Sequence, residues 1–447
     1  MSANYILNNP AWLGEIPSHW DCKKIGSLFT ERKVKVSDKE YPPLSVAKIG
    51  VVPQLDTAVK TDAGDNRKLV RIGDFVINSR SDRKGSCGVS ELDGSVSLIN
   101  IVLTPRNLWN SRYVHYLLRS QPFSEEYYRN GRGIVADLWT TRYSEMKSIL
   151  LPVPPRSEQD QIVRFLDWKV SSINKLISVK RKQIALLHER QSVHISHIVT
   201  HGLRNGVAAK ASGAEWLGDI PEHWHTMRCK YLFSERDERS QDGSEQHLSM
   251  SQKHGLVPDS QLDERRMLSE SYVGGKLCDK DDLVLNRLKA HLGVFALAPQ
   301  SGVISPDYTV LRPNTERLLP SFAETVLKSD CCRGELRIRV RGIIEGFWRL
   351  YTDDFNTIVL PVPPLDEQAE IMEYIVEFRD KAKKYEDTLT QEISSLQELK
   401  ARLISDTVTG KIDVRGIQIP EYEFAEENID TENDESMEGM KSETYEE

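Results

Sequence analysis

Two polar loops carry the residue types that bind nucleic acid. Each follows a short apolar run, residues 74–78 in one case and residues 282–286 in the other. Arginine can donate two hydrogen bonds to O6 and N7 of guanine, asparagine can pair with N6 and N7 of adenine, and either can hold a phosphate. We therefore predict DNA-binding residues in both loops: Asn78, Arg80, Arg83 and Lys84 in the first, and Asn286, Arg287, Lys289 and His291 in the second.

Basic residues also surround two tryptophans, Trp139 and Trp348. The further candidates for DNA binding are Arg132 and Arg142 near the first, and Arg341 and Arg349 near the second. For any one residue a solvated surface is an equally good interpretation, but recurrence at equivalent places favours binding for the loops as wholes. The tryptophans recur in register and are interpreted as core residues rather than as surfaces that stack on bases: Trp12, Trp20, Trp139, Trp216, Trp224 and Trp348.

The sequence lacks the loops that would bind a nucleotide or a catalytic metal. It contains no Walker A loop, no G-x-G-x-x-G and no H-E-x-x-H. Residues 9–12 resemble the N-P-P-Y loop of amino-methyltransferases, but they lack its second proline and no glycine-rich cofactor loop accompanies them. Glu145 and Lys147 have the E-x-K spacing of many nucleases, a combination that arises by chance in a chain of 447 residues. We therefore predict no catalytic residues.

Three histidines have a spacing that could hold a metal. His194, His197 and His201 fall along one face of a helix and can in principle bind Zn2+. Histidines near a helix end also interact favourably with the negative pole of the helix dipole, and the matching places in the second half of the chain hold no histidine. We predict no metal site. The six cysteines show no C-x-x-C spacing and are interpreted as free thiols.

A duplication organises the whole chain. Residues 12–20 (W-L-G-E-I-P-S-H-W) are matched by residues 216–224 (W-L-G-D-I-P-E-H-W), 204 residues later. Residues 151–159 (L-P-V-P-P-R-S-E-Q) are matched by residues 360–368 (L-P-V-P-P-L-D-E-Q), 209 residues later. Offsets that drift so little indicate two copies of one unit of about 200 residues, which is a duplicated domain rather than a solenoid.

Each Pro-rich motif ends a folded part and starts a long helix, because proline fits a first helical turn but not a helix interior. Ser157 and Asp366 are placed to cap these helices. Apolar residues then recur at steps of three and four, which predicts coiled-coil helices of about 40 residues and about 60 Å; two helices packed on their own domains are the alternative. The predicted seam comprises Ile162, Leu166, Val170, Ile173, Ile177, Ile184, Leu187, Ile195 and Ile198, and Ile371, Ile375, Phe378, Ala382, Tyr385, Leu389, Ile393, Leu396 and Leu403.

Between these landmarks the pattern is mixed. Short β-type runs alternate with turn residues at 74–78, 95–103, 282–286 and 303–311, and helices are predicted at 111–128 and 320–333. The expected order is a globular domain at 1–155, a long helix at 156–202, a linker at 203–213, a second globular domain at 214–364, a second long helix at 365–411 and an acidic tail at 412–447.

The tail dominates the net charge. From Glu421 to Glu447 the charge is −11, so the other residues carry +3 of the total of −8. A segment so acidic and poor in apolar residues is predicted to be disordered, and a slightly positive remainder is compatible with nucleic acid. No run of 18 apolar residues and no signal-like N-terminus occur, which predicts a cytoplasmic protein without a membrane span.

The doubled motifs resemble the specificity subunits of Type I restriction-modification systems. The resemblance runs from Trp12 to about Arg415, and residues 74–80, 282–287 and 305–308 are similar to parts of that family's target recognition domains. It implies a mixed α/β (α+β) fold with two target recognition domains, each followed by a long helix, and an antiparallel coiled coil of the two helices. It further implies a non-catalytic subunit that reads a bipartite, asymmetric site in double-stranded DNA.

The resemblance also implies partners and cofactors. Two methyltransferase subunits would dock on the coiled coil and bring S-adenosylmethionine for N6-adenine methylation. Restriction subunits would bring ATP hydrolysis and Mg2+, so this chain itself would hold no cofactor.

Two other functions remain open. A self-sufficient N6-adenine methyltransferase or nuclease would be active with S-adenosylmethionine or Mg2+ alone. A coiled-coil scaffold that binds only proteins would show no salt-dependent affinity for DNA, whereas several phosphate contacts make affinity fall steeply with salt.

Overall fold

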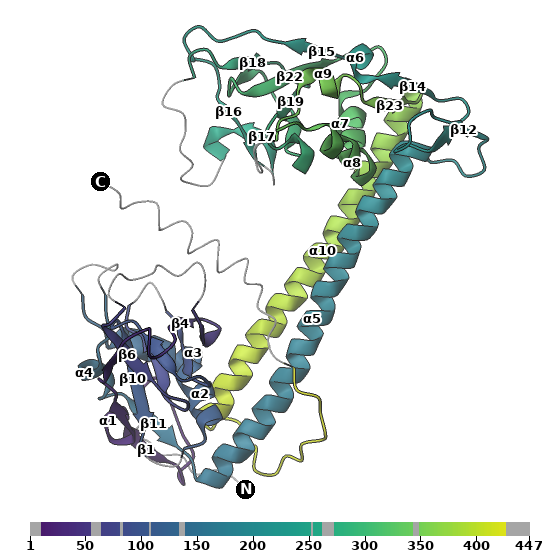
Figure 1. Ribbon diagram of the computed structural model, residues 1–447. Helices are drawn as coiled ribbons and strands as arrows, with labels where there is room; N and C mark the ends of the chain where they lie inside the picture. Colours follow the sequence, from purple (N-terminus) through teal and green to yellow (C-terminus); the bar gives the residue numbers. More distant parts are fainter. Residues whose placement is uncertain are drawn as a thin grey trace. The chain divides into compact units, whose positions relative to one another are not determined.

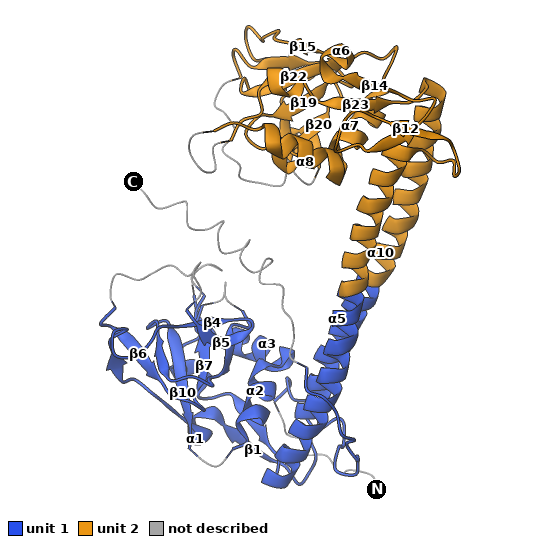
Figure 2. Cartoon of the chain, turned by 45° about the vertical axis from the view of Figure 1, so that its right-hand side comes forward, with its two compact units in different colours: residues 1–181, 390–447 blue, residues 182–389 orange. Residues whose placement is uncertain are grey.

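The computed structural model describes two compact units (Figure 2). Unit 1 comprises residues 1–181 and 390–447, and unit 2 comprises residues 182–389. Each unit therefore holds one globular part, the beginning of the long helix that follows it and the end of the other long helix. The structure describes residues 10–54, 64–80, 84–106, 109–133, 139–251, 254–261, 272–342 and 348–425.

Unit 1 is built on a mixed arrangement of short strands and helices. Its main sheet has the order β2-β10-β7-β8, and a second sheet has the order β3-β6-β9. The elements are β1 (Asp21–Lys24), α1 (Ile25–Leu28), β2 (Phe29–Glu31), β3 (Lys35–Val36), β4 (Leu44–Ala47), β5 (Gly50–Pro53), β6 (Arg67–Val70), β7 (Phe75–Asn78), β8 (Cys87–Val89), β9 (Gly94–Val96), β10 (Asn100–Pro105), α2 (Ser111–Arg119), α3 (Gln121–Arg129), α4 (Tyr143–Met146) and β11 (Leu150–Val153).

Unit 2 repeats this arrangement. Its main sheet has the order β15-β22-β19-β20, which corresponds strand for strand to β2-β10-β7-β8. The elements are β12 (Ala209–Ala211), β13 (Asp219–Pro221), β14 (His225–Arg228), α6 (Cys229–Leu232), β15 (Phe233–Arg236), β16 (Leu248–Ser251), β17 (Gly255–Pro258), η3 (Asp259–Gln261), β18 (Lys276–Cys278), β19 (Leu283–Asn286), η4 (Ala290–Leu292), β20 (Phe295–Leu297), β21 (Gly302–Ile304), β22 (Tyr308–Pro313), α7 (Pro320–Lys328), α8 (Asp330–Arg339), α9 (Thr352–Phe355) and β23 (Val359–Val362).

A buried aspartate precedes the central strand of each main sheet. Asp74, 2% exposed, accepts hydrogen bonds from Arg32 Nε (2.7 Å) and Thr104 Oγ1 (2.7 Å). Asp282, also 2% exposed, is held by Arg236 and Arg312. A buried carboxylate is tolerated only when it is paired and hydrogen-bonded, so these contacts fix the start of β7 and of β19.

The helix predicted at 111–128 is two helices, and so is the helix predicted at 320–333. The chain becomes extended at Ser120 (φ −61°, ψ 146°) and at Ser329, with the same angles. Each serine hydroxyl donates to a carbonyl three residues earlier, Leu117 in unit 1 and Val326 in unit 2. The run predicted at 95–103 likewise divides into β9 and β10.

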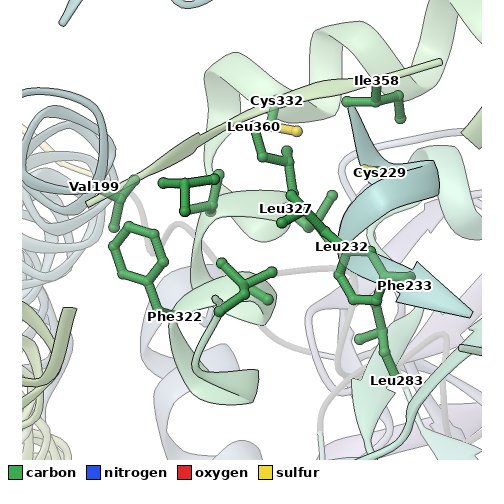
Figure 3. Packing of buried hydrophobic residues seen from close by; sticks show 14 of the residues in the cluster. Val199, Cys229, Leu232, Phe233, Leu283, Phe322, Leu327, Cys332, Ile358 and Leu360 are labelled. Atoms are coloured by element: carbon green, nitrogen blue, oxygen red, sulfur yellow. The ribbon is translucent and has the colours of Figure 1, made fainter. Parts of the chain in front are cut away.

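The core of each unit lies where the globular part meets the helices. In unit 2, Phe322 and Leu327 of α7 pack with Leu232 and Leu360, and Val199 from a long helix joins the same cluster (Figure 3). In unit 1 the equivalent cluster contains Ile162 and Leu166 together with Val408. The first residues of one long helix and the last of the other are thus part of the same hydrophobic core.

The two long helices, α5 (Arg156–His201) and α10 (Leu365–Val408), run side by side in opposite directions (Figure 1). In unit 1 Lys180 pairs with Glu392, and Lys400 contacts Asn174. In unit 2 His188 lies 3.4 Å from Glu386, and His194 contacts Tyr374 and Phe378. The predicted mixed α/β fold with paired, antiparallel long helices is confirmed.

Two details of the helices differ from prediction. Tyr385 does not lie in the seam, since 49% of it is exposed. Ser157 and Asp366 are not caps, because α5 begins at Arg156 and α10 at Leu365. The carbonyls of Pro155 and Pro364 instead accept the first helical hydrogen bonds, from Gln159 and Gln368 respectively.

The segments that follow the long helices are ordered by contact with the globular parts. β12, which lies within the predicted linker at 203–213, pairs with β13, which follows the linker. The start predicted for the disordered tail, residue 412, is too early. Val414 lies in the core of unit 1 and is only 1% exposed. Residues as far as Ala425 contact α5, and residues 426–447 lie outside the described part of the chain. No helix among the described residues is long and apolar enough to cross a membrane.

Candidate nucleic-acid interface

The two asparagines at the strand ends shape the loops that follow them. Asn78 is 8% exposed, and its Oδ1 accepts a hydrogen bond of 3.0 Å from the backbone N–H of Arg80. In unit 2, Oδ1 of Asn286 accepts a bond of 3.2 Å from Leu288 N–H. This local bond turns the chain out of the sheet immediately after the strand. The asparagine carbonyls are therefore occupied, whereas their NH2 groups keep donor capacity.

A second chain segment joins the loop of unit 1. The backbone groups of Arg132 and Thr140 bond to each other at 2.9 and 3.0 Å, and Thr141 N–H donates to Ser79 O at 3.0 Å. Thr140 also bridges to Arg80. Arg80 and Arg132, which are 52 positions apart in the sequence, are thereby brought to either side of one extended segment.

Unit 2 has the same arrangement. The backbone groups of Arg341 and Arg349 bond to each other at 2.9 and 2.8 Å, and Leu350 N–H donates to Arg287 O at 3.0 Å. The structure therefore brings together the loop residues and the tryptophan-associated residues that were predicted as separate groups. This convergence occurs in both copies, so it is a property of the repeated fold.

The candidate residues differ in how free their charges are. Arg80, Lys84, Arg132, Arg142, Lys289 and Arg349 are exposed, and none of them has a carboxylate partner among the described residues. Arg341 is different, because its guanidinium pairs with Asp354. Arg142 lies at the start of α4, directly after Thr141, and its carbonyl accepts from Met146 N–H. Arg83 lies outside the described residues.

His291 is buried beside basic residues in unit 2. It is 9% exposed, its ring lies edge-on to Trp348 at 5.6 Å, and its Nδ1 has no partner among the described residues. Burial and the nearby charge of Arg337 lower the pKa of His291 from its ordinary value. Nε of Arg287 is buried without a partner as well. His291 is consequently neutral at pH 7, and unit 2 presents its charge mainly through arginines and Lys289.

The tryptophans fall into two classes. Trp20 (3% exposed) and Trp224 (0% exposed) are core residues, as predicted. Trp348 is 39% exposed, so its interpretation as a core residue is wrong. Trp139 is half-buried and stacks on Tyr128 at 5.8 Å, over which Lys84 Nζ lies at 5.4 Å.

One residue that sequence reasoning did not select, Tyr128, also lies at these surfaces, as does Arg337 from the basic group around Trp348. Tyr128 at the end of α3 contacts Trp139, and the exposed Arg337 of α8 lies near His291. Their equivalence, at an offset of 209 residues, was visible once the repeat was aligned. The presence of an arginine at the equivalent position gave no chemical reason to choose Tyr128.

The three spaced histidines do not converge. His197 and His201 stack at 4.5 Å, while Nε2 of His194 lies 3.0 Å from the Tyr374 hydroxyl. Within the described ranges no group of three or more His, Cys, Asp or Glu side chains is placed to hold a metal ion.

Comparison with known proteins gives matches along the length of the chain. A putative type I restriction enzyme MjaX specificity subunit from Methanocaldococcus jannaschii is 21% identical over 439 residues, covering 90% of this chain and 96% of the relative. The type I restriction enzyme MjaVIII specificity subunit of the same organism is 22% identical over 435 residues, covering 90% of this chain and 95% of the relative. The chain is similar to type I specificity subunits. The resemblance inferred from the doubled motifs is thereby confirmed.

One solved structure shares the fold. A chain from a study of complex assembly and conformational transition of the type I R-M system has a TM-score of 0.60 at 13% identity, with 89% of this chain and 99% of that chain covered. The HsdS subunit from Thermoanaerobacter tengcongensis covers 89% of this chain and 98% of its own at a TM-score of 0.44 and 14% identity. No family model matches the sequence.

Proposed function

We propose that this chain is the DNA-recognising specificity subunit of a type I restriction-modification complex. The observation that carries the proposal is the doubled surface: in each unit a buried strand ends in a loop with exposed cations, and a tryptophan-bearing segment pairs with that loop. Exposed arginines and lysines without carboxylate partners suit phosphates and guanine edges. The names of the similar proteins from Methanocaldococcus jannaschii agree with this role.

In this proposal each unit reads one half of a bipartite, asymmetric site in double-stranded DNA. The two sets of candidate residues differ chemically, since unit 1 has Arg80 and Lys84 where unit 2 has Leu288 and Leu292. Different side chains at equivalent positions read different bases, which makes the two half-sites unlike. A site of this kind is asymmetric even though the protein fold is repeated.

The long helices are proposed to set the unspecified gap between the half-sites. α5 contains 46 residues and α10 contains 44. A continuous helix of 46 residues is about 69 Å long, and B-DNA repeats every 34–36 Å or so. A helix pair of fixed length therefore acts as a spacer whose length is independent of the base-reading loops.

The partners and cofactors belong to the same proposal. Two methyltransferase subunits would bind this chain and bring S-adenosylmethionine, and restriction subunits would bring ATP and Mg2+. The chain itself would be non-catalytic and hold no cofactor. This division is supported by the lack of Walker A, G-x-G-x-x-G and H-E-x-x-H motifs in the sequence.

The deciding experiment is genome-wide mapping of N6-methyladenine in cells that express the methyltransferase partner subunits with and without this chain. The proposal expects methylation of one bipartite motif only when the chain is present. Methylation by the purified chain with S-adenosylmethionine alone would instead identify a self-sufficient enzyme. If the methylome is unchanged and the assembled complex shows no salt-dependent binding of duplex DNA, the chain is a scaffold that binds only proteins.

A further inference from the structure

Unit 1 contains a pocket directly beneath its candidate DNA-binding residues. The pocket has a cavity volume of about 20 Å3, and Arg80 and Lys84 are among its lining residues. Its floor is formed by Ile77 (5% exposed), Cys87 (2%) and Leu118 (1%). The pocket is therefore an apolar recess whose lining also carries cationic side chains.

Aromatic side chains form the wall, and the polar groups of Trp139 and Tyr127 already make hydrogen bonds. Trp139 Nε1 donates to Tyr128 O at 2.9 Å, and the Tyr127 hydroxyl donates to Thr141 O at 2.8 Å. The hydroxyl of Thr141 donates to Tyr127 O at 3.0 Å, and the Cys87 thiol donates to carbonyls within the unit. The donor groups of Trp139, Tyr127, Thr141 and Cys87 are therefore not free to bind the polar edge of a base.

Gly131 allows the aromatic wall to lie where it does. A Cβ at this position would stand 2.3 Å from Trp139 Nε1 and 2.7 Å from Thr141 Oγ1, which no side chain can tolerate. The backbone of Gly131 therefore leaves the room in which Trp139 packs against Tyr128. The wall is fixed by the fold before any ligand arrives.

Asn78 supplies a polar group next to the apolar residues of the pocket. Its side chain lines the pocket, and its Oδ1 already accepts from the N–H of Arg80. The NH2 group of Asn78 is a donor that a ligand can use. A suitable ligand has an apolar group for the recess and a hydrogen-bond acceptor beside it.

Unit 2 has different residues at the equivalent positions. Phe295 stands in place of Cys87, Arg337 in place of Tyr128 and Arg333 in place of Ser124. His291 is buried there against Trp348. The recess is accordingly a feature of unit 1 and not a consequence of the shared fold.

We propose that this recess of unit 1 receives the C5-methyl group of a thymine in the major groove, with Trp139 as a specificity-determining residue. In the major groove thymine presents a methyl group next to the O4 acceptor, whereas cytosine presents an N4 donor and the purines present no methyl group. O4 matches the free donor of Asn78, and the methyl matches the floor of Ile77, Cys87 and Leu118. Lys84 suits an adjacent phosphate, and Arg80 suits a phosphate or a neighbouring guanine. The inference rests on the proposed function and assigns one base of one half-site.

The test uses duplexes that carry the mapped site, with each thymine replaced in turn by deoxyuridine, which lacks only the methyl group. Binding is measured for the chain assembled with its methyltransferase partners. One replacement is expected to weaken binding of the unaltered chain about fourfold, the effect of burying a single methyl-sized group. In Trp139→Ala that same replacement is expected to change affinity by less than about 1.5-fold, because the wall of the recess is gone.

Two further variants separate this role from general damage. Trp348→Ala removes the equivalent tryptophan of unit 2 and is expected to keep the fourfold discrimination at the unit 1 position. Trp139→Phe retains an aromatic wall and is expected to keep most of the discrimination between thymine and deoxyuridine. If no deoxyuridine effect differs between the unaltered chain and Trp139→Ala, or if the half-site altered by unit 1 substitutions contains no A·T pair, the inference is wrong. Absence of any sequence-specific binding by the unaltered complex would instead overturn the proposed function.

Discussion

His19 and Glu158 join the two repeated motifs of unit 1 through a contact of 2.8 Å between Nε2 and Oε2. His223 and Glu367 make the same contact, also 2.8 Å, in unit 2. The histidine of W-L-G-x-I-P-x-H-W therefore meets the glutamate of L-P-V-P-P-x-x-E-Q, although 139 residues separate them in one copy and 144 in the other. The contact ties the start of each globular part to the first turn of its helix.

Removing that contact is expected to loosen the docking of helix and domain. Glu158→Ala should lower the free energy of unfolding by about 1–2 kcal/mol, because one partner is largely buried and the bond involves a charged group. Urea denaturation followed by circular dichroism measures the change. Glu398→Ala, an exposed helical glutamate, is the control and should change stability by less than about 0.5 kcal/mol. Equal effects of the two substitutions would contradict a structural role for Glu158.

The glutamine after each glutamate is expected to contribute more to the free energy of unfolding than the glutamate does. Gln368 is 0% exposed, accepts from Leu319 N–H at 2.8 Å and donates to the carbonyls of Arg317 and Pro363 at 2.9 and 2.8 Å. Gln368→Ala should lower the free energy of unfolding by about 3 kcal/mol, because it leaves buried backbone groups without partners. Gln159 makes two such bonds, so Gln159→Ala should lower the free energy of unfolding by less than Gln368→Ala does. The two variants are compared by thermal and urea unfolding, and the reverse order would count against this explanation.

The exposed arginine of unit 1 provides a test of base reading. If Arg80 binds guanine through two hydrogen bonds, Arg80→Ala should weaken recognition at one position by about 1–3 kcal/mol and relax specificity there only. Methylation mapping in cells reads the change in motif. Arg402→Ala removes an exposed arginine of α10 and serves as the control. A motif unchanged by Arg80→Ala would exclude this role for Arg80.

The spacer role of the helices can be tested by lengthening both together. One heptad inserted after Lys180 and another beside Glu392, which faces it, adds about 10.5 Å to the pair. The gap between half-sites should lengthen by about 3 base pairs, at about 3.4 Å each, while both half-sites keep their sequences. A heptad inserted between Asn205 and Gly206, outside the helices, should leave the gap unchanged. New half-site sequences in the mapped motif would show that the helices do not act as the ruler.

Acid is expected to destabilise unit 1 through His115. Burial and the charges of Arg119 and Arg112 lower the pKa of His115 to about 3. Because this value lies below the unfolded pKa of about 6.5, the unfolded chain binds the extra proton first. Stability is therefore unaffected by this group above pH 6.5 and falls by up to about 1.4 kcal/mol per pH unit between pH 6.5 and 3.

Urea midpoints at pH 7.5 and pH 5 measure this loss. His115→Gln cannot take up the proton, so its midpoint should fall less between the two pH values than that of the unaltered chain. The same substitution at the exposed His225 is the control. If His115→Gln and the unaltered chain lose stability in parallel, other groups cause the acid sensitivity.

The sequence was most informative where physical requirements are local or repeated. Proline motifs and apolar spacing located α5 and α10, and the duplication placed matching strands in both units. It could not show that Ser120 and Ser329 interrupt their helices, because serine is tolerated in helices and the break depends on packing. Nor could it show that Thr140 joins Arg80 to Arg132, since that pairing depends on how distant segments meet.

Burial was harder to predict than secondary structure. Trp20 and Trp348 have the same side chain, yet one is 3% exposed and the other 39%. Trp20 packs against Gly410 after the end of α10, whereas Trp348 lies on a segment whose backbone bonds to Arg341 and Arg287 and leaves the side chain partly exposed. Tertiary context of this kind leaves no trace in local composition.

The hydroxyl of Tyr113 donates to the carbonyl of Val408 at 3.3 Å, within the core of unit 1. Unit 1 is thus assembled from two separate stretches of the chain, whereas unit 2 is one uninterrupted stretch. During synthesis on the ribosome, the second unit to be translated is consequently the first that can finish folding. A message cut short before codon 390 would yield a complete unit 2 joined to an unfinished unit 1.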